Sequence, residues 1–264
     1  MHYNIYIFDQ AQWEPMFAGQ RNEADHVVRS VKNWTLINSA DLCFNLGVFD
    51  MKTCASYTYV KGPKILTDAS GSFDKTIGGR SDILRINAYN ECKGYSNGIK
   101  NGCVLINAPM GGSAVRNGIG ITESGKVIIA QSTKPVSEKS FASAVNNYTA
   151  KRGEKVQLFV LQDGGGSTNE YSGISKLSFH ATGEDRKVAT VVCFKRISLP
   201  PVTRTLKFGR KGEDVRLLQT VLGGIEADGS FGINTYSRLR QAQRALGLDD
   251  DGWCGPLTRA ALKI

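Results

Sequence analysis

A glycine-rich segment, Asp163–Thr168, is the part of the sequence best suited to chemistry. It reads D-G-G-G-S-T and follows the apolar segment Val156–Gln162. Successive glycines let a ligand approach the main chain, and their N–H groups can form a nest for an anion. Asp163, at the end of a predicted strand, would project a carboxylate into such a site; the alternative is an ordinary hairpin loop. The residues predicted to contact substrate are Gly164, Gly165, Gly166, Ser167, Thr168 and Asp50.

Two carboxylates are the usual requirement for hydrolysing a glycosidic bond, one to donate a proton and one to assist the attack. Asp163 is the first candidate. Glu170, seven residues further on, is the second, and Asp50 is the next. Glu170 also fits a solvated loop position, which is the commoner place for a glutamate. Arg116 has the two-donor guanidinium that suits an anionic group, although an ordinary surface ion pair would use it equally well.

Other kinds of catalytic or metal site find no support in the sequence. No G-K-[ST] follows the glycines and no G-x-G-x-x-G opens a helix, which argues against the common nucleotide-binding motifs. The three histidines lie outside any serine or cysteine nucleophile motif, and neither H-E-x-x-H nor C-x-x-C occurs. We therefore expect no metal and no cofactor. The six cysteines are far apart in the sequence, and we expect free, mostly buried thiols.

Two further segments accompany the glycine-rich segment in a fixed order. Asn45–Asp50 reads N-L-G-V-F-D, and Arg116–Ile121 reads R-N-G-I-G-I. With D-G-G-G-S-T they resemble the phosphodiester glycosidase family, whose pattern is N-x-G-F-F, then R-x-x-x-G, then D-G-G-G-S. The resemblance covers about residues 35–175 and departs where Val48 replaces a phenylalanine. It implies hydrolysis at an N-acetylglucosamine linkage and an active site lined by Asn45, Arg116, Asp163 and the glycine loop.

Secondary-structure patterns predict an α+β catalytic domain, with a mixed sheet and helices. Segments rich in Val, Ile and Phe and bounded by Gly, Asn or Pro are typical of strands. One helix is predicted after Ser137, which can cap its N-terminus, and Gly153 is expected to end it. One face of this helix carries Phe141, Val145 and Tyr148. The predicted strands are Leu42–Leu46, Cys103–Asn107, Ile119–Thr122, Val127–Gln131, Val156–Gln162 and Val188–Phe194.

The C-terminal part of the chain contains an internal repeat. Asp228–Thr235 and Asp251–Thr258 both read D-G-x-x-G-x-x-T, at an offset of 23 residues, and a Leu-Gly pair precedes each copy. Each copy predicts a helix that ends at glycine, a tight turn and the start of a new helix. We therefore expect a small all-α, three-helix C-terminal domain.

Residues 205–264 resemble the small peptidoglycan-binding module of cell-wall hydrolases, with Ala242 where that family usually has an aromatic residue. The aromatic ring of Trp253 could stack on a sugar, and nearby carboxylates could bind hydroxyl groups. The alternative for Trp253, and the expected place of Phe231, is the core of a small domain. The residues predicted to bind the cell wall are Trp253, Asp228 and Asp251.

The clearest domain boundary is at Pro200-Pro201, because two prolines stiffen an extended linker and remove backbone donors. We expect a catalytic domain at residues 1–197, a linker at 198–204 and a binding module at 205–264. The chain has 264 residues and a formal net charge of +9, which favours polyanionic partners. Nucleic acid is not expected, since no dense Arg/Lys tract with aromatic residues occurs, and no apolar run is long enough to insert into a membrane.

Together these features predict a cell-wall-targeted glycosidase that cleaves an N-acetylglucosamine-containing linkage of bacterial peptidoglycan. Residues 1–20 lack a basic region followed by an apolar one, so we expect no secretory signal. Synthesis in the cytoplasm and access to the wall after holin-type release would fit a phage endolysin. Two alternatives stay open at this point: a glycosidase acting on sugar-phosphodiester bonds of teichoic acid, and a non-catalytic wall-binding protein.

Overall fold

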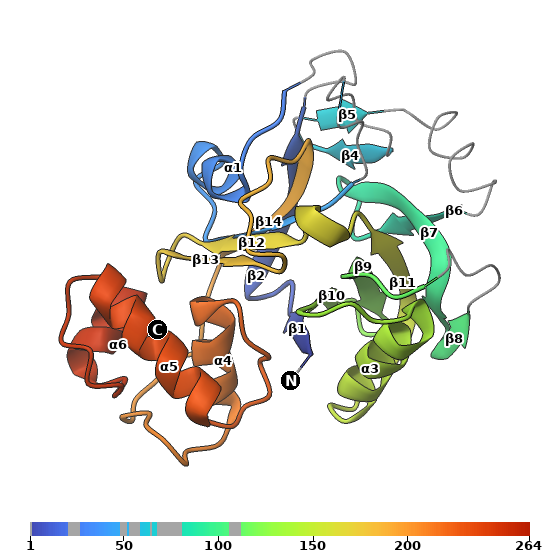
Figure 1. Cartoon of the computed structure of the whole chain (residues 1–264). Helices are drawn as coiled ribbons and strands as arrows, with labels where there is room; N and C mark the ends of the chain where they lie inside the picture. Colours follow the sequence, from blue (N-terminus) through green and yellow to red (C-terminus); the bar gives the residue numbers. More distant parts are fainter. Residues whose placement is uncertain are drawn as a thin grey trace.

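The computed structural model describes residues 2–20, 27–47, 52, 59–63, 65–67, 81–105 and 112–264. In this part of the chain two antiparallel sheets pack face to face, and a helical module lies against one end of them (Figure 1). One helix covers the outer face of each sheet, so the layers follow the order helix, sheet, sheet, helix. The predicted α+β fold with a helical C-terminal part is confirmed.

The first sheet has the strand order β1-β10-β9-β11-β7-β4-β5, with β6 and β8 also paired to β7. It joins the beginning of the chain to its middle, because β1 pairs with β10 from Tyr3 opposite Ser132 to Phe8 opposite Val127. Its strands are β1 (Tyr3–Phe8), β4 (Val60–Gly62), β5 (Ile65–Thr67), β6 (Ser81–Arg85), β7 (Glu91–Lys100), β8 (Cys103–Leu105), β9 (Asn117–Thr122), β10 (Val127–Ser132) and β11 (Val156–Gln162).

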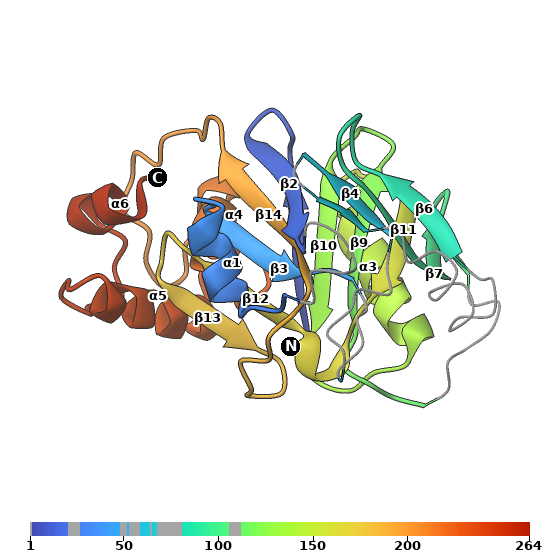
Figure 2. The ribbon, with the colours of Figure 1, turned by 90° about the horizontal axis from the view of Figure 1, so that it is seen from above.

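The second sheet has the strand order β13-β12-β3-β14-β2. Figure 2 shows helix α1 (Val31–Ile37) against this sheet and the C-terminal helices beside it. The strands are β2 (Trp13–Gly19), β3 (Leu42–Asn45), β12 (Asn169–Ser172), β13 (Leu177–His180) and β14 (Thr190–Arg196). The sequence patterns missed the two N-terminal strands β1 and β2, the strands β4 to β7 of the first sheet, and β12 and β13.

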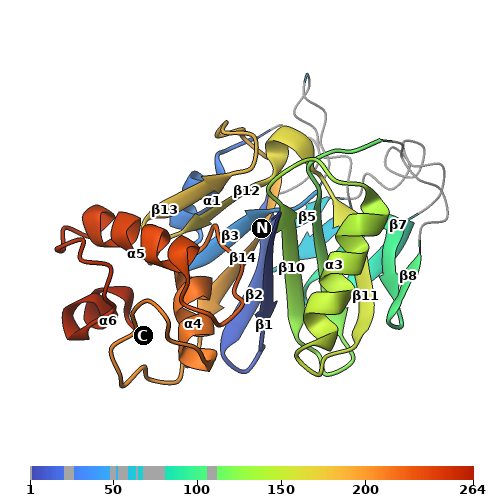
Figure 3. The same cartoon turned by 60° about the horizontal axis from the view of Figure 1, so that its bottom comes forward.

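Helix α3 (Glu138–Ala150) follows the prediction closely. The side chain of Ser137 accepts a hydrogen bond from the N–H of Ser140, as an N-cap does. Phe141 and Val145 are fully buried against Phe159 and its neighbours on the first sheet. Figure 3 shows α3 lying across the outer face of this sheet. The periodic apolar face predicted from the sequence is therefore the face that packs.

The core between the two sheets is built from aromatic residues of both. Phe8 of β1 and Phe194 of β14 stack with their ring centres 3.8 Å apart, and Phe44 of β3 meets Phe194 edge-on at 6.0 Å. All three side chains are buried. Such rings bury large apolar areas and prefer stacked or edge-on contacts, so they fix how the sheets face each other.

The expectation of free thiols is wrong for two of the six cysteines. Cys43 of β3 and Cys193 of β14 lie directly opposite each other in the second sheet and form a disulfide. Their separation of 150 residues hides this proximity, because only the pairing of distant strands brings them together. Cys92 and Cys254 are free and buried, Cys103 is free and exposed, and Cys54 lies outside the described residues.

The repeat in the C-terminal module is explained by two buried glutamines, each 1% exposed. Gln219 donates to Asp228 (2.8 Å) and to Thr235 Oγ1 (2.9 Å), and its carbonyl accepts from Gly229 N (2.7 Å). Gln243 makes the matching bonds with Asp251 (2.8 Å), Thr258 (3.2 Å) and Gly252 N (2.9 Å). The helices of the module are α4 (Glu213–Leu222), α5 (Ile233–Ala245) and α6 (Pro256–Leu262).

The module packs directly on the front domain. Ser172 Oγ and Ser175 Oγ donate to the carbonyls of Val221 and Leu222 at the end of α4, at 2.6 and 3.0 Å. Tyr148 of α3 donates to the carbonyl of Ala227 at 2.5 Å. Apolar residues of both parts, with Val202 and Leu206 from the connecting segment, form one continuous core. Residues 198–204 therefore connect two docked bodies. Among the helices of the described ranges, none has the length and apolar character of a membrane span.

We expect the glutamine contacts to carry much of the module's stability. Replacing Gln243 by alanine leaves the buried N–H of Gly252 and the hydroxyl of Thr258 without that partner. This should lower the free energy of unfolding by about 2–3 kcal/mol. Gln219→Ala should cost a similar amount, because its contacts match. Urea denaturation followed by circular dichroism measures both.

Gln157→Ala is the matched control, since this glutamine is exposed on β11 and should change stability by less than about 0.5 kcal/mol. Equal stability of the Gln243→Ala and Gln157→Ala proteins would show that the buried amide contributes nothing to the turn.

Candidate functional site

The glycine-rich loop is the crossing point between the two sheets. It begins where β11 of the first sheet ends, forms a single 3-10 turn at Gly165–Ser167, and continues into β12 of the second sheet. The predicted strand Val156–Gln162 is confirmed as β11. Asp163 therefore stands at the end of a largely buried strand, as the sequence predicts.

Two of the three glycines are required for different reasons. A Cβ on Gly164 would lie 2.4 Å from the carbonyl oxygen of Val115, so the loop packs here against the backbone leading to β9. Gly165 donates its N–H to the same carbonyl at 2.9 Å. Gly165 has φ +57° with open space around it, so glycine is favoured there by conformation and not by crowding.

Several backbone N–H groups of this loop, the donors that an anion nest would use, are already hydrogen-bonded within the protein. Besides Gly165, Ser167 donates its N–H to Gly164 O and Thr168 donates to Gly165 O, both at 3.2 Å. These backbone donors are occupied by carbonyl groups within or beside the turn. Contact of Gly164, Gly165, Gly166, Ser167 and Thr168 with substrate stays a prediction.

Asn45 connects the segments on both sides of the loop. Its side-chain nitrogen donates to the carbonyl of Asp163 at 2.8 Å, and its side-chain oxygen accepts from the N–H of Asn169 at 3.1 Å. Asn117 of β9 donates to the backbone carbonyl of Asn45 at 3.0 Å. The sequence places Asn45 in the active site, and the structure shows it bonded beside Asp163.

Asp163 is half-buried as a residue, and desolvation of its carboxylate raises the pKa of this group to about 6. Hydrogen bonds from the Ser167 hydroxyl and the Gly164 N–H, together with the charge of Arg186, oppose the rise. A carboxyl group with a pKa near the working pH can act as a general acid or a general base. This is the strongest chemical feature of the loop.

Arg186 is the cation that the structure adds to this site. A Cβ on Gly166 would lie 2.5 Å from the guanidinium carbon of Arg186. The side-chain nitrogen of Asn169 donates to the carbonyl of Arg186 at 3.2 Å, and the side-chain oxygen of Asn169 lies 3.1 Å from His180 Nδ1. Arg186 lies in the polar segment between β13 and β14, where no sequence motif marks it; Asn169 directly follows the glycine-rich segment.

Arg116 lies beside the loop through its backbone, but its guanidinium points toward α3. It forms an ion pair with Glu138 at 3.5 Å and donates to the carbonyls of Val136 (3.4 Å) and Gly112 (3.3 Å). Arg116 is 9% exposed, so this is not a surface ion pair. Its predicted contact with an anionic substrate group would have to compete with Glu138.

Glu170 lies at the interface with the C-terminal module and not beside Asp163. Tyr6 donates to its carboxylate at 3.1 and 3.2 Å, and the N–H of Gly224 also donates to it. Burial raises the pKa of Glu170 to about 7, although these donors and the nearby Arg238 lower it. A carboxylate held in this way, 2% exposed, supplies no second catalytic group to the glycine loop in this arrangement. The solvated loop position is excluded as well.

Asp50, the other candidate for the second carboxylate, lies outside the described residues, as does Val48. Its predicted role therefore stays a prediction. Two polar atoms beside the loop, Thr168 Oγ1 and Gln131 Oε1, are buried without a hydrogen-bond partner among the described residues. Buried polar groups are normally paired, so these atoms retain hydrogen-bonding capacity next to Asp163. Within the described ranges no group of three metal-binding side chains occurs.

In the C-terminal module, Trp253 is 52% exposed and Phe231 is buried. Lys207 lies over the Trp253 ring, with its Nζ 4.7 Å from the ring centre. An exposed indole is suited to contact with a sugar, and here Lys207 lies over one face of the ring. Asp228 and Asp251 each use one carboxylate oxygen inside their turn. The core position expected for Phe231 is confirmed, while wall contacts of Trp253, Asp228 and Asp251 stay predictions.

Comparison with known proteins supports a relation to the cell wall. Residues 211–262 match the family described as "Putative peptidoglycan binding domain". The fold resembles the catalytic domain of zebrafish N-acetylglucosamine-1-phosphodiester alpha-N-acetylglucosaminidase, auto-inhibited by its pro-peptide. The TM-score is 0.53 at 14% identity, covering 73% of this chain and 82% of the zebrafish chain.

A hypothetical protein from Synechocystis gives a TM-score of 0.43 at 10% identity, covering 72% of this chain and 56% of the Synechocystis chain. No curated protein sequence matches the chain. At these identities the likeness to solved structures shows the fold alone.

The close packing of the loop predicts unequal effects at neighbouring glycines. Gly165→Ala should cost about 1 kcal/mol of unfolding free energy, because alanine is strained at positive φ. Gly164→Ala should cost more, since its methyl group would clash with the carbonyl oxygen of Val115. This oxygen belongs to the backbone, so it cannot move aside as the end of a flexible side chain could. Urea denaturation of both variants tests the difference.

Gly153→Ala is the matched control, because Gly153 has φ +72° and open space around it at the end of α3. It should behave like Gly165→Ala. A Gly164→Ala protein as stable as the control would contradict the packing of the loop against β9.

The buried position of Glu170 predicts a pH-dependent contribution to stability. A folded pKa of about 7 lies above the ordinary value of about 4.3, so the folded state binds the proton more tightly. The resulting stabilisation is complete below about pH 4.3 and is lost as the pH rises through 7. Glu170→Gln removes this titration. The stability of the wild type relative to Glu170→Gln should fall by on the order of 3 kcal/mol between pH 4.5 and 7.5.

Urea denaturation across this pH range measures the difference in stability. The titration of Asp163 does not contribute to this difference, because both proteins retain Asp163. A constant difference between the two proteins at all pH values would mean that Glu170 titrates normally.

Proposed function

We propose that this protein is a glycosidase of bacterial cell-wall polymer, with its active site at the glycine-rich loop. The observation that carries the proposal is the half-buried Asp163 at the start of the glycine-rich loop, whose pKa of about 6 suits proton transfer, in a chain that includes a peptidoglycan-binding domain. The fold likeness to a glycosidase catalytic domain is consistent with it. The module would hold the catalytic domain on an insoluble substrate and raise its local concentration there.

Asp163 would act as the general acid that protonates the leaving oxygen or, in its ionised form, as a general base. Burial keeps a useful fraction of the group protonated near neutral pH, and the Ser167 hydroxyl orients it. Asn45 acts as a positioning residue, because it holds the Asp163 carbonyl and the start of β12. Asp50 is the proposed second carboxylate.

The proposed substrate is peptidoglycan, cut at an N-acetylglucosamine linkage. A second candidate is a sugar-phosphodiester bond of wall teichoic acid. Arg186 favours this second candidate, since its guanidinium lies against Gly166 within the electrostatic reach of Asp163 and guanidinium groups bind phosphate well. Within the first candidate, we propose an endolysin role for a bacteriophage, with access to the wall after holin-type release.

Asp163→Asn and Trp253→Ala should separate catalysis from wall binding. Asp163→Asn should lower the rate of hydrolysis 10²–10⁴-fold, because it removes the proton donor, and should leave sedimentation with walls unchanged. Trp253→Ala should weaken sedimentation while release of products from soluble fragments continues. Mass spectrometry of products from purified peptidoglycan and, separately, teichoic acid identifies the bond through new reducing ends or new phosphomonoesters.

An Asp163→Asn protein whose rate is within about threefold of the wild type would contradict the proposal, because this loss is far smaller than expected. The active site would then have to lie elsewhere. Wild-type protein that sediments with walls and releases no product from either polymer would support the non-catalytic alternative.

A further inference from the structure

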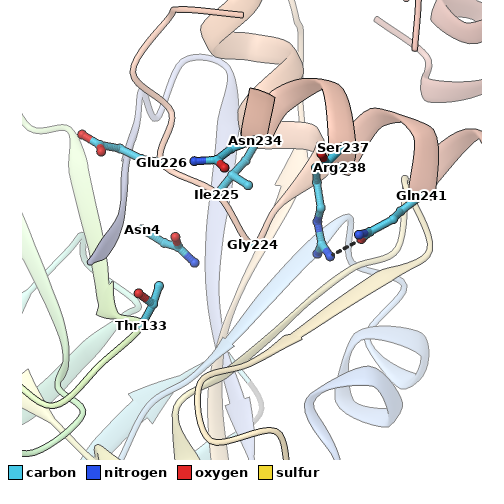
Figure 4. A pocket seen from close by; sticks show the side chains of 9 residues that line it. All are labelled: Asn4, Thr133, Gly224, Ile225, Glu226, Asn234, Ser237, Arg238 and Gln241. Atoms are coloured by element: carbon cyan, nitrogen blue, oxygen red, sulfur yellow. Dashed lines mark hydrogen bonds between the residues drawn. The ribbon is translucent and has the colours of Figure 1, made fainter. Parts of the chain in front are cut away.

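A polar pocket of about 310 Å³ lies between the front domain and the C-terminal module. Figure 4 shows the residues that line it: Asn4 of β1 and Thr133 after β10 on one side, and the loop after α4 with helix α5 on the other. On α5 the lining residues Asn234, Ser237, Arg238 and Gln241 follow the spacing of one helix face. Neither part of the chain forms this pocket alone.

The chemistry of the lining fits a neutral, hydrogen-bonding ligand. The lining consists mainly of amide and hydroxyl side chains, with one cation, Arg238, and one acidic residue, Glu226. Because Arg238 and Glu226 carry opposite charges, the lining has no excess of positive charge that would select an anion. Amides and hydroxyls both donate and accept, so they suit a ligand with many hydroxyl or amide groups. The volume lies at the lower end of the range of small-molecule sites.

Asn4 is the observation that points to a ligand. It is 3% exposed, and its side-chain nitrogen has no hydrogen-bond partner among the described residues. Figure 4 shows its amide pointing toward Gly224, inside the ring of lining residues. A buried amide without a partner costs free energy, and a ligand carbonyl or hydroxyl oxygen in the pocket would supply the acceptor.

The opposite wall is held in position before any ligand binds. Arg238 donates to Gly223 O at 2.8 Å and to Ser178 O at 3.0 Å, which fixes its guanidinium between the two domains. Gly224 has φ +67°, and a Cβ there would lie 2.6 Å from Arg238 Nη2. A preformed wall of this kind reduces the ordering cost of binding.

The pocket lies at the same end of the first sheet as the glycine-rich loop. Asn4 is opposite Gln131, Gln131 is opposite Asn117, and Asn117 is opposite Gln162, which precedes Asp163. Three strand spacings place Asn4 about 14 Å from Gln162. This separation is comparable with the length of a few linked sugars.

We propose that this interdomain pocket binds a neutral sugar unit carrying an acetamido group, as a subsite for the same polymer that the glycine loop cleaves. The inference rests on the proposed function, because it takes the polymer to be the glycan that the module and the loop share. Asn4 donates to the ligand, while Ser237 and Gln241 of α5 contact its hydroxyl groups. Binding therefore depends on both domains and on the way they are docked.

Calorimetric titration of the full chain with the N-acetylglucosamine tetramer tests the pocket, in an Asp163→Asn background so that the ligand is not cleaved. Asn4→Ala should weaken binding about tenfold, as loss of a hydrogen bond to a buried group does. Ser237→Trp should weaken binding at least as much by filling the pocket. Ser237 is exposed on α5, so this second variant keeps the core intact if Asn4→Ala folds poorly.

Gln157→Ala, at the other end of the first sheet, is the control and should bind like the background protein. Inorganic phosphate should not compete with the tetramer. Unchanged affinity in folded Asn4→Ala and Ser237→Trp proteins, or competition by phosphate, would overturn the proposal. Release of reducing ends from walls by the wild type is measured separately, so a failed pocket and a failed catalytic function give different results.

Discussion

The buried side-chain amide of Asn45 is the contact on which the arrangement of the candidate site depends. One amide holds the last residue before the glycines and the first residue of the next strand, at 2.8 and 3.1 Å. Because Asp163 follows a strand of the first sheet and Asn169 begins a strand of the second, the same hydrogen bonds that shape the loop also help to fix the sheets relative to each other. A buried amide that both donates and accepts is a strong constraint, since another arrangement would leave these polar groups unpaired. The position of Asp163 follows from that constraint.

The docking of the C-terminal module bears on how wall binding and the proposed hydrolysis at the glycine-rich loop would be coupled. A binding module on a free linker raises the local concentration of catalyst without orienting it. Here Tyr148, Ser172 and Ser175 donate to carbonyl groups of the module, and the apolar core continues across the boundary. The polymer would be presented to the glycine loop in a fixed direction. Glu170, which the sequence suggests as a catalytic residue, contributes to this orientation.

Local features of the fold could be predicted from the sequence, and distant pairings could not. Helix α3 and its cap at Ser137 follow from side-chain spacing, and the repeated turns follow from glycine and aspartate positions. The disulfide between Cys43 and Cys193 depends on strand pairing across 150 residues. Arg186 reaches the loop from a polar segment without a motif, and a sequence cannot show that it packs on Gly166. The surroundings of Glu170 could not be predicted for the same reason, because its partners Tyr6 and Gly224 are distant in sequence.

The two turns of the C-terminal module share one internal design and have acquired different surroundings. The first turn carries Ser230 where the second carries Trp253, and the carbonyl of Ala227, just before the first turn, is bound by the front domain. The second turn carries an exposed indole ring at the corresponding position. Under the proposed function, duplication of a unit separates attachment from recognition within a single small domain. Residues at the tip of the second turn could then change without disturbing the contact that holds the first turn to the front domain.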